Sequence, residues 1–204
     1  MNRILLATHN PAKSEEFKSA INKIAGNKIQ LLTLSDVGVE DSPDETGITF
    51  KENAYLKAKY YYGLTGLPTL SDDGGLVIPA LNNEPGVKSN RWLGYQATDE
   101  ELIRYTLYRM DGLKDVKRKG YLELCLCYFN GNKIQTRYAE ERIYGHIALK
   151  PSKKTVKGFP YRALLVIDKY GKYYDELTKS EHNKINHRIK AVRQLTKYIL
   201  NLVI

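Results

Sequence analysis

The chain has 204 residues, of which 42% are hydrophobic and 27% are charged, a composition typical of a soluble globular protein. Lys and Arg number 32 against 23 Asp and Glu, which gives a formal net charge of +9. These values exclude a disordered or collagen-like chain, and no run approaches the roughly 20 apolar residues of a membrane-spanning helix. The first residues lead into a strand pattern without a cleavable leader, so the sequence predicts one cytoplasmic domain over residues 1–204 with no membrane partner.

The N-terminal quarter shows a strand, a helix and a second strand. A buried strand is expected at Arg3–Thr8, followed by a helix with Asn10 as its N-cap and Pro11 in its first turn. Gly26 is expected to end this helix, and the second strand is expected at Ile29–Leu34.

Two capping boxes mark later helices. Thr49 with Glu52 predicts one helix start, and Thr98 with Glu101 predicts another. Between them, a short strand at Pro68–Ser71 is expected to stop before two aspartates and two glycines.

The second half of the chain adds a hairpin and a terminal helix. Asn130-Gly131 separates two strand-like runs, Tyr121–Phe129 and Lys133–Tyr144, which is a strong hairpin signal. A further strand is expected at Ala163–Asp168, and the apolar stripe of a C-terminal helix begins at Ile185. Alternating strands and helices with one antiparallel hairpin predict an α/β fold with a mixed sheet covered on both faces.

The two cysteines lie in one of these strands. Cys125 and Cys127 are two residues apart, so their side chains point to the same face and cannot easily bridge each other. We interpret them as reduced core residues, with a pair of metal ligands as the alternative.

The positive charge is concentrated near the C-terminal end. Residues 1–149 hold 19 basic and 19 acidic side chains, whereas residues 150–204 hold 13 basic against 4 acidic ones. This segment either meets an anion, which could be nucleic acid, a membrane surface or a phosphorylated small molecule, or forms a solvated lysine-rich surface.

The first candidate for binding chemistry is the turn between the first strand and its helix, Thr8–Lys13. Free amides at a helix N-terminus attract anions, and Lys13 one turn into the helix would add a charge toward a phosphate. Asn-Pro caps also begin many helices that bind no ligand, so this motif alone leaves both interpretations open.

The second candidate is acidic. Glu45 lies in a loop rich in turn-forming residues, and Asp72-Asp73 precedes two glycines, so we expect the carboxylates at the carboxyl end of a strand, where open α/β sheets bind ligands. Carboxylates from two loops together with phosphate oxygens commonly hold Mg²⁺. The alternatives are an ordinary Asp-Asp-Gly-Gly turn and, for Lys57, a merely solvated side chain.

The third candidate is the basic C-terminal end. Phe159 and Tyr161 offer aromatic faces on which a base could stack, and Arg188 offers donors to phosphates or base edges. His187 and Arg188 fall off the apolar stripe, so we expect them to face outward, as the polar residues of any surface helix also do.

Taken together, these segments resemble the inosine triphosphate pyrophosphatase family. The matching blocks occur in family order along nearly the whole chain: ATHNPAKSEEF, ETGITFKENAYLKAK, LPTLSDDGGL, ALNNEPGVKSNRW, KGFPY and ELTKSEHNKINHR. The resemblance implies an elongated α/β fold with a central mixed sheet, two lobes with a nucleotide cleft between them, and a homodimer. It also implies Mg²⁺-dependent attack of water on the α-phosphate of non-standard purine nucleoside triphosphates such as dITP, ITP and XTP.

The resemblance also implies roles for residues of this chain. Asp73, Asp72 and Lys57 would be catalytic, with Asp73 activating water or binding metal, Lys57 neutralising phosphate charge, and Glu45 and Asp73 holding Mg²⁺. Substrate contacts would come from residues spread along the chain: Thr8, Asn10, Lys13, Gly74, Phe159, Tyr161, Arg162, His182, His187 and Arg188. No specific nucleic-acid partner is implied.

Several positions depart from the family pattern. Gly74 stands where the family has serine, Pro160 replaces a glycine, Arg162 replaces an aspartate, and His182 stands where a base-contacting lysine is usual. Asn82-Asn83 replaces a Gly-Gly pair, a milder change because Asn tolerates left-handed backbone. Two alternatives therefore stay open: a pyrophosphatase with altered base specificity, and a nucleotide- or nucleic-acid-binding relative without turnover.

Overall fold

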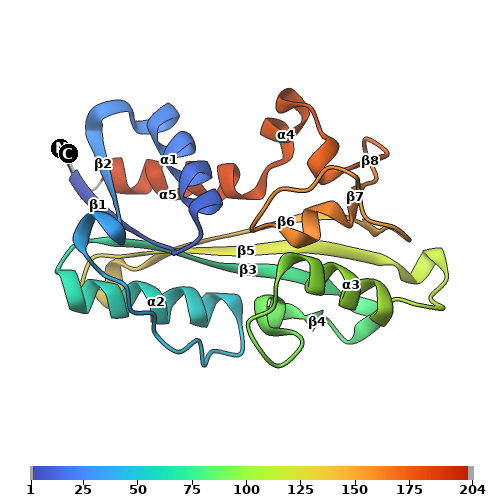
Figure 1. Ribbon diagram of the computed structural model, residues 1–204. Coiled ribbons are helices and arrows are strands. Elements are labelled where there is room, and N and C mark those ends of the chain that lie inside the picture. The colour runs from blue at the N-terminus through green and yellow to red at the C-terminus, as the bar shows by residue number, and fades with distance from the viewer. Residues whose placement is uncertain (1, 202–204) are drawn as a thin grey trace. The chain divides into compact units, whose positions relative to one another are not determined.

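The computed structural model describes residues 2–201. Within that range the strands form one mixed, eight-stranded sheet in the order β2-β1-β3-β5-β6-β7-β8, with β4 paired to β3 (Figure 1). β1 pairs in parallel with both β2 and β3, whereas β3–β4, β6–β7 and β7–β8 are antiparallel. The predicted α/β class with a mixed sheet flanked by helices is confirmed.

The strands and helices have the following bounds. The strands are β1 Asn2–Ala7, β2 Ile29–Thr33, β3 Thr69–Ile78, β4 Glu84–Pro85, β5 Lys119–Phe129, β6 Arg137–Ile147, β7 Leu165–Ile167 and β8 Lys172–Tyr173. The helices are α1 Pro11–Ala25, α2 Phe50–Thr65, α3 Asp99–Arg109, α4 Lys179–Ile185 and α5 His187–Asn201. The short helix η7, Pro160–Ala163, precedes β7.

The described chain divides into two compact units, each assembled from separate segments. Unit 1 comprises the described residues up to Asp73, Leu124–Glu141 and those from His187 onward. In this unit α1 packs against α5 on one face of the strands, and α2 covers the other face (Figure 1). Its main core joins α1, the strands and α5 through residues such as Phe17, Leu126 and Val192.

Unit 2 comprises Gly74–Glu123 and Arg142–Asn186. Its core is built from α3, the unit's strand segments and the segment around η7, and α3 packs directly against η7. Leu102, Met110 and Leu164 are fully buried there. Because its members come from distant parts of the chain, this core holds the aromatic residues of the 158–177 segment in place.

Local signals in the sequence set most element boundaries. The Asn10 side chain accepts a hydrogen bond from the Lys13 amide, and both predicted capping boxes are present at α2 and α3. Gly26 ends α1 with φ of 53°. Asn82 and Asn83 have φ of 55° and 66°, which is the left-handed backbone that the glycines they replace would adopt.

The expected end of the third strand is wrong. β3 does not stop at Ser71 but continues through both aspartates and both glycines to Ile78. We call Asp72 and Asp73 the acid pair. Beyond it, the Ser89 hydroxyl accepts a hydrogen bond from the Leu76 amide, and a Cβ on Gly75 would lie 1.9 Å from the Ser89 hydroxyl oxygen. Because Gly75 has no side chain, the loop that carries Ser89 packs directly against β3, and the strand stays extended where a turn was expected.

The C-terminal helix also differs from its expected form. It is broken at Asn186, which is fully buried and ends α4, and α5 starts at the next residue. The second hairpin strand and the strand after η7 are likewise shorter than expected at their starts. No helix within residues 2–201 has the length and apolar character needed to cross a membrane. Cys125 and Cys127 are buried and form no disulfide, as predicted.

Candidate active site

One face of α2 organises the acidic part of the site in unit 1. Asn53, Lys57 and Tyr61 are spaced four residues apart, so they lie on the same side of the helix. All three contact residues 39–48, which we call the acid loop, or the adjoining acid pair of β3. The Asn53 Oδ1 accepts from the Gly47 amide at 2.8 Å, and its Nδ2 donates to Asp73 Oδ2 at 3.3 Å.

Lys57 joins two of the predicted carboxylates. Its Nζ lies 2.7 Å from Glu45 Oε1 and 3.0 Å from Asp73 Oδ1. Burial opposes the charge on Lys57, but the carboxylates of Asp73, Glu45 and Asp72 outweigh it and raise the lysine pKa above its ordinary value. For Asp73 burial prevails, with the Glu45 charge adding to it, so its pKa is raised despite the attraction of Lys57.

Asp72 has the opposite environment. It is 1% exposed, and Lys13 Nζ donates to its Oδ2 at 2.8 Å. Burial alone would raise the pKa of Asp72, but the positive charges of Lys13, Arg188 and Lys57 overcome this effect and lower it. Consecutive residues of a strand point to opposite faces, so Asp72 faces Lys13 near α1 while Asp73 faces Lys57 of α2. The pKa values of these two neighbouring carboxyl groups are therefore shifted in opposite directions.

The turn between β1 and α1 lies beside this pair through Lys13. We call Thr8–Lys13 the phosphate turn. The Thr8 hydroxyl accepts from the Asn10 amide at 3.2 Å, and Asn10 caps the helix through the Lys13 amide. The turn therefore presents a helix N-terminus with a lysine already directed at Asp72.

His187 and Arg188 are buried, contrary to the expectation that they face solvent. Because α5 begins as a new helix after Asn186, His187 and Arg188 point inward and do not continue the polar face expected for one unbroken helix. Arg188 Nη1 lies 3.4 Å from Glu16 Oε2 of α1, and its charge acts on Asp72. The structure thus joins Arg188 to the acid pair.

The residues predicted to read the base come together in unit 2. Arg162 is 5% exposed, with its guanidinium carbon 3.6 Å from the Phe159 ring centre and 4.9 Å from that of Tyr174. The predicted stacking face of Phe159 is therefore partly covered by an arginine of the same chain. His182 meets the Tyr174 ring edge-on at 5.1 Å.

Tyr161 has a structural contact where the sequence suggested a substrate contact. It is buried, its hydroxyl donates to the Ser89 carbonyl, and burial raises its pKa. Gly74 lies half-buried within β3. Sequence reasoning missed Tyr61, which only its four-residue spacing from Lys57 and Asn53 could have indicated.

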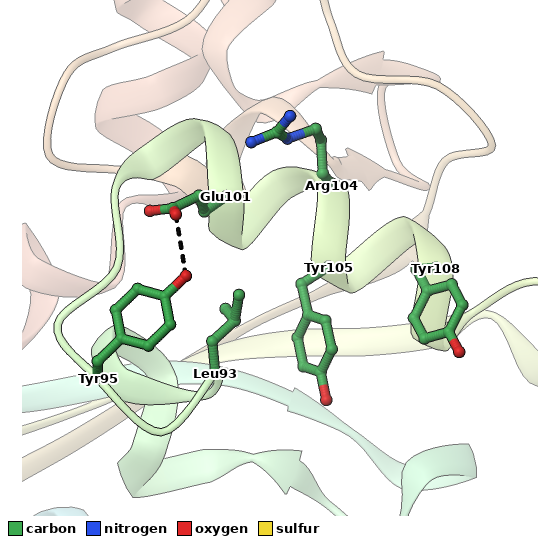
Figure 2. Close-up of a pocket in the computed structure, with 6 residues that line it drawn as sticks. All are labelled: Leu93, Tyr95, Glu101, Arg104, Tyr105 and Tyr108. Atoms are coloured by element: carbon green, nitrogen blue, oxygen red, sulfur yellow. Dashed lines mark hydrogen bonds between the residues drawn. The ribbon is translucent and has the colours of Figure 1, made fainter.

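A separate surface pocket lies on α3 and holds none of the predicted site residues. It has a volume of about 360 Å³ and is lined by Leu93, Tyr95, Glu101, Arg104, Tyr105 and Tyr108 (Figure 2). The Tyr95 hydroxyl donates to Glu101, the acid of the α3 capping box. This pocket contains a single acid and one arginine, so it lacks the paired carboxylates of unit 1.

The acid pair and the acid loop offer carboxylate oxygens, the type of ligand that hard cations prefer. Within the described residues no three His, Cys, Asp or Glu side chains gather closely enough to hold a metal by themselves. Mg²⁺, however, is commonly held by one or two carboxylates plus phosphates, and Glu45 and Asp73 meet at one lysine. The buried Asp72 Oδ1 has no hydrogen-bond partner among these residues, which leaves a further oxygen in this region.

Comparison with known proteins shows the family of the chain. The model of the Ham1 family matches residues 4–198. The chain belongs to the Ham1 family. A dITP/XTP pyrophosphatase of Thermoanaerobacter sp. (strain X514) is 36% identical over 97% of this chain and 96% of its own length. That of Elusimicrobium minutum (strain Pei191) is 38% identical over 97% and 99%. A solved HAM1 protein from Coxiella burnetii superposes with a TM-score of 0.86 at 33% identity, covering 98% of this chain and 100% of the other.

These matches confirm the family resemblance and the enzyme class predicted from the sequence. The Ham1-family chain spans almost the full length of its relatives, so the blocks that carry the resemblance are parts of one continuous match. The roles of individual residues stay predictions.

Proposed function

We propose that this Ham1-family protein hydrolyses non-standard purine nucleoside triphosphates, such as dITP, ITP and XTP, to nucleoside monophosphate and pyrophosphate. The observation that supports this most directly is the pair of adjacent aspartates with opposite electrostatic environments, each facing its own lysine. The names of the related dITP/XTP pyrophosphatases support the choice of substrate.

The cationic residues bind and neutralise the triphosphate. Thr8, Asn10 and Lys13 of the phosphate turn hold phosphate oxygens, and Arg188 adds charge from the start of α5. Lys57, half-buried between carboxylates, neutralises charge that develops on the phosphates. His187 stands beside Arg188 as a further nucleotide contact.

Asp73 is the group that takes the proton from the attacking water. Its raised pKa brings it closer to the range of an effective general base than an exposed aspartate would be. Asp72, held ionised by Lys13, keeps the lysine in place and supports Asp73. Glu45 and Asp73 would hold Mg²⁺, which when bound would withdraw charge from the phosphate oxygens.

The purine base is read by unit 2. Phe159 provides the stacking ring, and Arg162 and His182 replace the aspartate and lysine of the family pattern. A buried guanidinium donates only, so it favours 6-oxopurines through O6 and N7. The stacking of Arg162 on Phe159 also supports the second candidate, a pyrophosphatase with altered base specificity.

A panel of nucleoside and deoxynucleoside triphosphates with Mg²⁺ tests the function. We expect pyrophosphate and monophosphate in equal amounts, with non-standard purines preferred over the four common bases. Stepwise release of orthophosphate would contradict cleavage between the α- and β-phosphates, and binding without any turnover would favour the non-catalytic relative. A homodimer and a cytoplasmic location stay predictions that sedimentation and cell fractionation can test.

A further inference from the structure

Beside the acid pair, three groups of unit 1 form a closed hydrogen-bond triangle. The Tyr61 hydroxyl donates to the Asp41 carbonyl at 3.0 Å, and His9 Nε2 lies 3.1 Å from the Tyr61 hydroxyl and 3.3 Å from the same carbonyl. A carbonyl oxygen only accepts, so the contact between His9 Nε2 and the Asp41 carbonyl is a hydrogen bond in the tautomer that carries the ring hydrogen on Nε2. Burial raises the pKa of the Tyr61 hydroxyl, which keeps it a donor.

This triangle joins two segments with different proposed tasks. His9 belongs to the phosphate turn, directly before Asn10, and Asp41 belongs to the acid loop that carries Glu45. Tyr61 stands on α2 one turn beyond Lys57 and is 2% exposed, so its ring cannot follow the loop if the loop moves away. The triangle is therefore a direct polar link between the phosphate turn and the acid loop.

The acid loop depends on few such contacts. It has no helix or strand of its own within residues 39–48. At its start, the Val39 amide donates a hydrogen bond to the Leu34 carbonyl. At its end, the Gly47 and Ile48 amides donate to side chains of α2. Between these ends, Asp41 and Ser42 contact the Tyr61 hydroxyl and Glu45 contacts Lys57, and these contacts anchor the loop to α2.

We propose that His9 and Tyr61 are positioning residues that couple the phosphate turn to the acid loop, so that an anion bound at the turn orders the loop that carries Glu45. The proposal rests on the proposed function for the identity of the anion, a phosphate chain. An anion that fixes the turn restricts His9, and His9 in turn restricts Tyr61 and the Asp41 carbonyl. Neither residue needs to touch the substrate for this effect.

Amide hydrogen exchange of the metal-free protein, with and without inorganic pyrophosphate, tests the coupling. In the wild type we expect pyrophosphate to slow exchange in residues 40–48. Tyr61→Phe keeps the buried ring but removes the hydroxyl, and His9→Ala removes the link at an exposed position. Each variant should speed exchange of the free loop by about fivefold, the effect of one lost hydrogen bond, and should abolish its response to pyrophosphate.

Two further variants separate positioning from general damage. Tyr60→Phe removes a hydroxyl from the neighbouring ring on the same helix and should behave as the wild type. His9→Gln restores an N–H donor near the place of Nε2 and should recover the response. In turnover assays, Tyr61→Phe should raise the Mg²⁺ concentration that gives half-maximal rate by about fivefold while kcat at saturating Mg²⁺ changes less.

An unchanged loop in Tyr61→Phe, or a wild-type loop that ignores pyrophosphate, would overturn the coupling. Both results are independent of turnover, so the coupling can fail while the triphosphate panel still shows pyrophosphate release. Conversely, a protein that cleaves no triphosphate but shows the exchange response would keep the coupling and reject the proposed reaction.

Discussion

At the scale of the residue, two neighbouring aspartates differ because a strand directs them to opposite faces. Asp72 meets Lys13 and keeps a lowered pKa, while Asp73 meets Lys57 in a site where burial and Glu45 raise its pKa. The same alternation would exchange their environments if β3 shifted by one residue. The chemistry of the pair thus depends on the register of one strand.

Asp73→Asn should lower kcat by roughly 10²-fold or more, because an amide cannot accept the proton of the attacking water. Steady-state kinetics on the preferred triphosphate measures this loss. Asp44→Asn, which removes an equal charge from an exposed position in the acid loop, is the control. Near-normal turnover of Asp73→Asn would transfer the role to Asp72 or Glu45.

Arg162→Asp with His182→Lys restores the family residues and should change the order in which bases are accepted. An unpaired buried donor costs about 1–3 kcal/mol, so one altered contact shifts discrimination by about tenfold. The comparison of kcat/KM across the triphosphate panel measures the change, with Arg104→Asp on the exposed side of α3 as control. If the ranking of bases stays the same, Arg162 only packs against Phe159.

At the scale of the element, the acid loop shows how one backbone position fixes a segment. A Cβ on Gly47 would lie 2.6 Å from Asn53 Oδ1 and 2.7 Å from Glu52 Cβ, the side chains that hold the loop to α2. Since Asn53 is fully buried and also donates to Asp73, it cannot move aside without disturbing the acid pair.

Gly47→Ala should therefore reduce kcat/KM by at least about tenfold through displacement of the loop, the effect of losing one to two kcal/mol of positioning. Gly63→Ala is the matched control, because it lies in α2 with no atom within 4 Å of the added methyl. That variant should keep its activity and gain up to about 1 kcal/mol of stability. Equal activity of both variants would show that the loop tolerates the methyl.

The start of α4 provides a test of pH dependence. The Lys172 ammonium and the Thr178 cap lower the pKa of Glu181 from 4.5 to about 2. A carboxyl with a lowered folded pKa contributes stability above pH 4.5 and loses that contribution as the pH falls toward about 2.

Glu181→Gln should be less stable than the wild type at pH 7 and should lose less stability between pH 4.5 and 2. Urea unfolding at several pH values measures both differences, with Glu15→Gln on the exposed side of α1 as control. Parallel pH curves for wild type and Glu181→Gln would contradict this assignment.

Local signals predicted the elements well, whereas contacts between distant residues did not emerge from the sequence. Asn10, Thr49 and Thr98 cap their helices as their neighbours along the chain require. The continuation of β3 could not be predicted, because it depends on Ser89 packing over Gly75.

The site was predictable to a similar extent. The lysines and carboxylates of unit 1 could be named from their motifs, but the triangle of His9, Tyr61 and the Asp41 carbonyl forms only when three segments meet. The burial of Arg188 likewise follows from the helix break and from Glu16, which lies 172 residues away in the sequence.

At the scale of the whole molecule, the charge of +9 is the property that sequence alone left ambiguous. The surplus lies in residues 150–204, where Arg162 is buried against the Phe159 ring and Arg188 is buried beside Glu16. Basic side chains that are buried or paired within the protein do not neutralise phosphates of a polynucleotide or release its counterions, so they add little to nucleic-acid affinity.

Binding to DNA or RNA should therefore be weak at physiological salt, with a Kd above about 1 μM and no sequence preference. Fluorescence anisotropy with labelled duplex and single-stranded oligonucleotides at several salt concentrations measures this. Nanomolar affinity with a steep salt dependence would instead favour the nucleic-acid-binding relative.

The packing of α1 against α5 has a consequence for biosynthesis. Helix α1 is synthesised well before its partner α5, and the two are seen as neighbouring blue and red ribbons in Figure 1. Until α5 is synthesised, apolar residues of α1 such as Phe17 and Ile21 lack the cover that Val192 and Leu195 give them. Because Lys13 and Arg188 come from these same two helices, the two charges that act on Asp72 come together only after α5 has been synthesised. A nascent chain therefore carries Asp72 and Asp73 long before both of these cations are in place.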